Sequence, residues 1–227
     1  MKLIWKKTFL CMSVLSLTLL GGCDNSTEEN KITNKEAQTE ETEVKLVEND
    51  LYVEPLNPTQ AQIKAYNLLS EAIANEDHEK EAEMVAVSFA FDFFTLSNKE
   101  DAEDLGGLQF IPTDKIGSFM EFARSYYYGN YPTIVNEYGK DSLPEVSGYT
   151  VDSVTASEHT YNGSPCNGYD IKLTLTYKDT EVERLKTSLS ISVIELSDFD
   201  YDRTKDYTDT VIYDTEMKNV YRVLAVE

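Results

Sequence analysis

The sequence predicts one α+β domain in which helices pack on one side of a curved antiparallel sheet. Two observations lead to this prediction. Apolar residues recur at helical spacing from about residue 58 to residue 138, whereas after Pro144 they alternate with polar residues. Helices followed by consecutive strands with one solvated face favour an antiparallel sheet that is covered on its other face. The roughly 170 residues from 58 to 227 are enough for a single core.

The first helix is expected to begin at Asn57-Pro58, because Asn can cap a helix and Pro suits the first helical position. Gln60, three residues after the cap, completes the pattern of a helix start. The apolar residues that then follow at helical spacing are Ile63, Tyr66, Leu69 and Ile73. A second helix is predicted from Glu79 to about Leu96. Its apolar residues cover such a wide face that we expect it to be mostly buried.

Two further helices are predicted before the strands. Gly106-Gly107 interrupts the helical pattern, and a third helix is expected from near Thr113 to Gly129. A short helical piece from Pro132 to Tyr138 is closed by Gly139.

The second half of the chain predicts four strands. Tyr149 and Val151 begin the first, and its apolar phase shifts at Ser153-Val154, which indicates a bulge. Strict alternation predicts two half-buried strands, over residues 169–177 and 185–193. The run from Val220 to Val226 is apolar on both faces and is expected to be the last strand.

The N-terminus has the layout of a signal peptide. Three lysines precede an apolar run from Thr8 to Leu20, which is too short to be a stable membrane span and is followed by Gly21-Gly22-Cys23. Leu20 to Cys23 resembles the bacterial lipobox, in which the cysteine thiol takes a diacylglyceryl group and becomes the new N-terminus. The resemblance implies cleavage of residues 1–22, lipidation with palmitate-type acyl chains at Cys23, and stable anchoring. An ordinary secretory leader with a nearby cysteine is the alternative.

This lipobox resemblance also implies a location. Asp24 is similar to the inner-membrane retention signal of Gram-negative lipoproteins, and it has no sorting meaning in a Gram-positive cell. Both interpretations place the protein on the extracytoplasmic face of the cell membrane. The membrane is then a partner through the lipid anchor.

The chain is strongly acidic, with 20 basic and 41 acidic residues and a formal net charge of −21. Loss of residues 1–22 would remove three lysines and lower this charge to −24. Such a surface is repelled by nucleic acid and by anionic lipid headgroups, which excludes nucleic acid as a partner. Residues 23–57 are predicted to be an acidic tether before the domain at 58–227, although Val44–Val53 has enough apolar residues to dock on that domain.

The order of elements resembles the NTF2-like, cystatin-like superfamily, in which helices cover a strongly bent sheet and often close a cavity. The segments Phe89–Lys99 and Gly106–Phe110 are also similar to uncharacterised lipoproteins of Firmicutes. This resemblance implies a fold for residues 58–227. It carries no diagnostic catalytic motif.

Asp92 is the candidate pocket residue, because it lies in a run of four phenylalanines, where a charge needs a partner or a pocket. NTF2-like enzymes typically place an acid or a histidine inside the cavity. By that resemblance Asp92 could act as a general base together with a tyrosine from 126–128. The alternative is that Asp92 pairs with Arg124 or points to solvent. The predicted pocket residues are Asp92, Arg124, Tyr126 and Tyr127.

Other chemistry has weak sequence signals. Five acidic residues fall at positions one, three, five, nine and twelve of a calcium-binding loop. They are weak candidates for calcium ligands, because Arg203 replaces the glycine of the sharp turn. They are Asp198, Asp200, Asp202, Asp206 and Asp209. His78 and His159 lack zinc-site spacing, and the sequence contains no phosphate loop or nucleophile elbow. Cys166 is expected to be an inert thiol, and no cofactor is predicted.

Two functions follow from this sequence. The first is a non-enzymatic, membrane-anchored extracytoplasmic protein that binds a protein partner or another ligand. The second is a small-molecule pocket, in a binding lipoprotein or in an enzyme of the isomerase, dehydratase or hydrolase type. The shape of the space between helices and sheet discriminates between them.

Overall fold

A group of helices precedes an antiparallel sheet in residues 44–227, which are the residues that the computed structural model describes. This confirms the predicted α+β class. The signal peptide, Cys23 and Asp24 lie outside the described residues. The helices are α1 (Gln60–Ala74), α2 (His78–Phe94), α3 (Ile116–Tyr126) and α4 (Tyr131–Tyr138), and the strands are β1 (Val146–Tyr161), β2 (Ser164–Tyr177), β3 (Ser188–Asp198) and β4 (Lys218–Val226).

The strands form one sheet in the order β1-β2-β3-β4, so each strand pairs with its neighbour in the chain. The predicted bulge is confirmed, because the register of β1 on β2 shifts between Val151 and Ser153. Asn162 and Gly163 both have positive φ, 48° and 81°, as the tight turn of a two-residue hairpin requires. The third strand begins at Ser188, three residues later than the alternation from Leu185 predicts.

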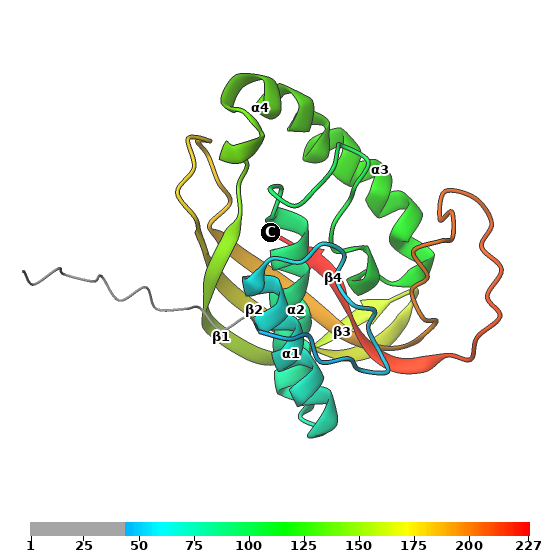
Figure 1. Ribbon diagram of the computed structural model, residues 1–227. Coiled ribbons are helices and arrows are strands. Elements are labelled where there is room, and N and C mark those ends of the chain that lie inside the picture. The colour runs from blue at the N-terminus through cyan, green and yellow to red at the C-terminus, as the bar shows by residue number, and fades with distance from the viewer. Residues whose placement is uncertain (1–43) are drawn as a thin grey trace, which may run out of the picture. The chain divides into compact units, whose positions relative to one another are not determined.

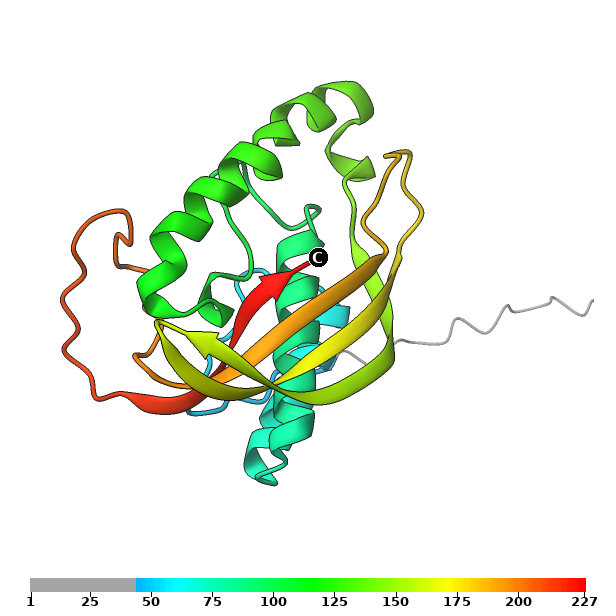
Figure 2. The same cartoon turned by 180° about the vertical axis from the view of Figure 1, so that it is seen from behind.

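Helix α2 is the central element of the fold (Figure 1). It contacts all four strands on one side and α1 on the other. At this contact the ring of Phe91 meets the ring of Tyr149 edge-on, with centroids 5.8 Å apart. Buried side chains of α2 and the sheet fill the space between them. Figure 2 shows the strands curving around α2, while α3 and α4 run along one edge of the fold.

Helix α1 begins two residues later than the sequence pattern predicts. Its N-cap is Thr59, whose hydroxyl accepts a hydrogen bond from the backbone N–H of Gln62 at 3.2 Å. The Gln62 side chain in turn accepts one from the backbone N–H of Thr59 at 2.8 Å. This reciprocal capping box satisfies two helix-end donors at once, so the predicted cap at Asn57 is wrong.

The segment before α1 belongs to the folded unit, as the apolar residues of Val44–Val53 suggest. The backbone N–H of Val47 donates to Asn67 on α1, and the side chain of Asn49 donates to Ser70 at 3.0 Å. Tyr52 is 4% exposed, and its hydroxyl exchanges hydrogen bonds with the backbone of Tyr221 on β4. Folded structure therefore begins before residue 58. No helix within residues 44–227 combines the length and apolarity needed to cross a membrane.

Candidate functional site

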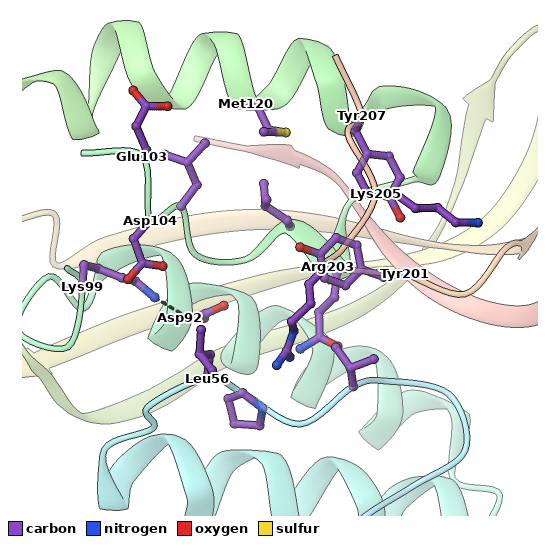
Figure 3. A pocket seen from close by; sticks show the side chains of 15 residues that line it. Leu56, Asp92, Lys99, Glu103, Asp104, Met120, Tyr201, Arg203, Lys205 and Tyr207 are labelled. Atoms are coloured by element: carbon purple, nitrogen blue, oxygen red, sulfur yellow. Dashed lines mark hydrogen bonds and ion pairs between the residues drawn. The ribbon is translucent and has the colours of Figure 1, made fainter. Parts of the chain in front are cut away.

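A pocket of about 310 Å³ lies at the C-terminal end of α2 (Figure 3). It forms where residues 53–56, α2, the loop 99–109, α3 and the loop 201–207 meet. None of its lining residues belongs to a strand, so it is separate from the filled space between α2 and the sheet. The lining comprises Val53, Pro55, Leu56, Asp92, Lys99, Glu103, Asp104, Leu105, Leu108, Gln109, Met120, Tyr201, Arg203, Lys205 and Tyr207.

Asp92 lies in this pocket, and both of its carboxylate oxygens are engaged. Oδ1 forms an ion pair with Lys99 Nζ at 2.8 Å, and Oδ2 accepts a hydrogen bond from the backbone N–H of Gly107 at 2.7 Å. The side chain of Lys99 is only 5% exposed. A buried charge requires such a partner, so this pair accounts for an acid within an aromatic helix face.

Two glycines let the loop return close to α2 and present a backbone N–H to Asp92. A Cβ at Gly106 would lie 2.0 Å from the backbone oxygen of Asp92. Gly107 has a φ of 79°, in the left-handed region that favours glycine. The Gly106-Gly107 break in the helical pattern is therefore the feature that gives Asp92 its second partner, the backbone N–H of Gly107, whereas Lys99 lies in the turn directly after α2.

The other predicted pocket residues do not join Asp92. Arg124 forms its ion pair with Glu103, so the predicted pairing of Arg124 with Asp92 is wrong. Tyr126 is 73% exposed and packs on Phe122, with ring centroids 5.0 Å apart.

The remaining two tyrosines of the run 126–128 are packing residues. Tyr127 packs against Phe93 and Phe94, with ring centroids 4.9 Å and 5.4 Å away. The buried Tyr128 hydroxyl donates to the backbone oxygen of Phe93 and accepts from the N–H of Gly106. Burial raises the pKa of both hydroxyls well above the usual range. Neither residue lines the pocket, and a general-base pair with Asp92 is not formed.

The tyrosines that do line the pocket are Tyr201 and Tyr207, which the sequence did not single out. Their rings stack with centroids 5.7 Å apart. The Tyr207 hydroxyl accepts a hydrogen bond from the backbone N–H of Asp202 at 3.0 Å, which fixes the turn between them. Burial raises the pKa of Tyr201 to about 12, so this hydroxyl is neutral at physiological pH.

The five acidic residues of the predicted calcium loop do not converge. Asp198 forms a buried ion pair with Arg222 at 2.9 Å, and Asp200 pairs with Lys218 at 2.9 Å. Asp202 and Asp206 each accept hydrogen bonds from the threonine two residues later, and Asp209 accepts one from the backbone N–H of Thr210. The part of the chain that the structure describes holds no cluster of three or more such residues suited to a metal. The structure therefore does not bring the five calcium candidates together.

One further group resembles a nucleophile site but lacks its geometry. Cys166 lies directly opposite His159 in the β1–β2 ladder, a proximity that the sequence distance concealed. Ser157 Oγ and Asp170 Oδ1 approach the same ring nitrogen of His159, Nε2, at 2.8 Å and 3.4 Å. A catalytic histidine uses one nitrogen for the nucleophile and the other for the acid, so this group is not a triad.

Comparison with known proteins found no match to the chain among family models, curated proteins or solved structures.

Proposed function

We propose that this chain is a membrane-anchored lipoprotein of the extracytoplasmic face that binds a ligand and catalyses no reaction. The leader and the Leu20-Gly21-Gly22-Cys23 sequence support the anchor. The observation that carries a binding role is the engagement of Asp92. The ion pair with Lys99 and the hydrogen bond from Gly107 give Asp92 a structural role that requires no substrate.

The binding site in this proposal is the pocket at the end of α2. Its volume of about 310 Å³ and its lining by charged, aromatic and apolar side chains suit a small molecule better than a flat protein partner. A protein partner remains the second candidate. It is favoured by the exposed aromatic pair Phe122 and Tyr126 on α3.

The proposal extends to the architecture. A long helix across a curved meander of four strands is the arrangement expected of an NTF2-like or cystatin-like domain, and the order α2-β1-β2-β3-β4 supports this. The filled space between α2 and the sheet differs from the open cone of NTF2-like enzymes. This difference is a second reason to propose binding rather than catalysis.

Metabolic labelling tests the anchor. The full-length chain and two variants, Cys23→Ser and Cys166→Ser, are expressed in a bacterium that matures lipoproteins and is fed an alkyne analogue of palmitate. We expect label and membrane recovery for the unmodified chain and for C166S, and an unlabelled, uncleaved chain for C23S. Label on C23S, or an unlabelled wild-type chain free of the membrane, would contradict the proposal.

A further inference from the structure

Within the described part of the chain, some charged side chains of the pocket have no ion-pair partner, and their charges indicate the kind of ligand that would fit. Asp92 and Lys99 neutralise each other, as the dashed line in Figure 3 marks. Glu103 is paired with Arg124. The ammonium of Lys205 is directed at the backbone oxygen of Ile212 and at Asp214, away from the pocket. Asp104 and Arg203 are the charged lining residues that remain.

Arg203 presents an open guanidinium at the mouth of the pocket. Its Nη2 donates to the backbone oxygen of Glu54, and no carboxylate lies within ion-pair distance of it among residues 44–227. Arg124 and Arg222 are both paired with carboxylates, whereas the exposed Arg184 of the β2–β3 loop, which does not line the pocket, forms no ion pair within residues 44–227. Arg203 is thus the arginine of the pocket lining, and its guanidinium is open to a ligand. Its planar fork fits a carboxylate with two parallel hydrogen bonds.

Two acceptors on the pocket wall lack donors. Asp104 accepts one hydrogen bond, at Oδ2 from the backbone N–H of Glu100, and its Oδ1 has no partner within the described chain. Gln109 is 6% exposed, and its side-chain oxygen has no hydrogen-bond partner among the described residues. Burial without a donor is unfavourable for the Gln109 oxygen, whereas the Asp104 carboxylate is only half-buried. A ligand that brings N–H donors would remove this cost.

These residues lie on different walls of the pocket. Asp104 and Lys99 come from the loop that follows α2, and Arg203 enters from the loop between β3 and β4 (Figure 3). The lining also includes large apolar side chains. They are Leu56, Leu105, Leu108 and Met120. A matching ligand therefore has a carboxylate at one end, an ammonium group at the other and an apolar side chain.

We propose that the pocket binds a zwitterionic α-amino acid or dipeptide. The carboxylate lies against Arg203, the ammonium group donates to Asp104 and Gln109, and the apolar side chain contacts the wall that includes Leu105 and Met120. The volume of about 310 Å³ is near the lower end of ligand pockets and suits a molecule of this size. This inference depends on the proposed function, in which the pocket is the binding site.

Isothermal titration of the full-length chain in detergent tests the ligand class with matched probes. Two probes, L-leucine and glycyl-L-leucine, are zwitterions. The other two carry a single charge: 4-methylpentanoate lacks the ammonium group of leucine, and 3-methylbutylamine lacks its carboxylate. We expect heat from at least one zwitterion and an affinity at least about tenfold weaker for both single-charge analogues. Equal affinity for an analogue, or no heat from either zwitterion, would overturn the proposal.

Variants of equal charge change test the residues. Arg203→Gln is expected to weaken zwitterion binding about tenfold or more, whereas Arg184→Gln, in the exposed loop between β2 and β3, leaves it unchanged. Asp104→Asn is expected to weaken it similarly, with the exposed Asp141→Asn as its control. Unfolding midpoints establish that each variant is folded. The analogue series on the unmodified chain decides the matter if a variant does not fold.

The two proposals fail separately. C23S retains every pocket residue, so we expect it to bind the zwitterion with the affinity of the wild-type chain. Labelled wild-type protein with no zwitterion binding would contradict the ligand class and leave the anchor standing. Zwitterion binding by an unlabelled wild-type chain would contradict the anchor alone.

Discussion

Replacing Asp198 with Asn should destabilise the fold far more than the same change at Asp200, two residues away. Asp198 is 7% exposed, and its Oδ2 lies 2.9 Å from Arg222 Nε and 3.1 Å from the backbone N of Thr113. Arg222 is 1% exposed, and its Nη1 already lacks a hydrogen-bond partner among the described residues. Removal of the carboxylate charge would leave this guanidinium buried and uncompensated.

The expected size of the effect follows from burial. Breaking a buried ion pair by removing one partner costs about 3–5 kcal/mol. With a urea m-value of about 2 kcal/mol per molar, D198N should lower the unfolding midpoint by about 2 M. Asp200 and Lys218 are 35% and 39% exposed in their side chains, and a surface pair contributes at most about 1 kcal/mol. D200N should therefore lower the midpoint by less than about 0.5 M.

Urea titration of both variants, followed by far-UV circular dichroism, measures this difference. Combining D198N with Arg222→Met completes a double-mutant cycle. In the R222M background D198N should lower the free energy of unfolding much less, because no buried guanidinium is left without a carboxylate. Equal midpoint shifts for D198N and D200N would refute the argument that burial, rather than charge count, makes Asp198 important.

Two further predictions concern α2. Gly106→Ala should destabilise the chain by about 1–3 kcal/mol, because the new Cβ would lie 2.0 Å from the backbone oxygen of Asp92; thermal unfolding checks this against Gly148→Ala, whose nearest neighbour is 3.8 Å away and which should melt within about 2 °C of wild type. Burial raises the pKa of the Glu81 carboxyl above its ordinary value of 4.5, so the folded state gains relative stability below that pH and loses it as the pH rises. Glu81→Gln should therefore raise the urea midpoint at pH 7 and have a diminishing effect toward pH 4, and an equal gain at both values would contradict the pKa direction.

Local periodicity was sufficient to predict most of the elements. The alternation over 169–177 and the phase shift at Ser153 are properties of the strands themselves, and the structure has both the strand and the bulge. The start of α1 was missed because two caps compete within three residues. Asn57-Pro58 matches the residue preferences of a helix start, but Thr59 and Gln62 form a capping box in which each side chain accepts a hydrogen bond from the backbone N–H of the other.

The site was harder to predict because its residues come from distant segments. The phenylalanine run correctly marked Asp92 as an acid that needs a partner. One partner is Lys99, in the turn just beyond the end of α2, and the other is the backbone N–H of Gly107, which the return of the loop at Gly106 brings to Asp92. Arg203 and Tyr201 reach the same pocket from more than 100 residues further along the chain. Helical or strand spacing contains no information about such contacts.

The pocket is built from loops, yet each loop is tied to the core. The Tyr66 hydroxyl on α1 donates to the backbone oxygen of Tyr52, which holds the segment that leads to residues 53–56. The Asp92–Lys99 pair holds the second loop, and the stacked rings of Tyr201 and Tyr207 hold the third. Ordering of loops on binding costs free energy, and these contacts supply that order in advance. Because the Asp92–Lys99 pair holds one of these loops, the acid that resembles a catalytic base has a structural role in shaping the pocket.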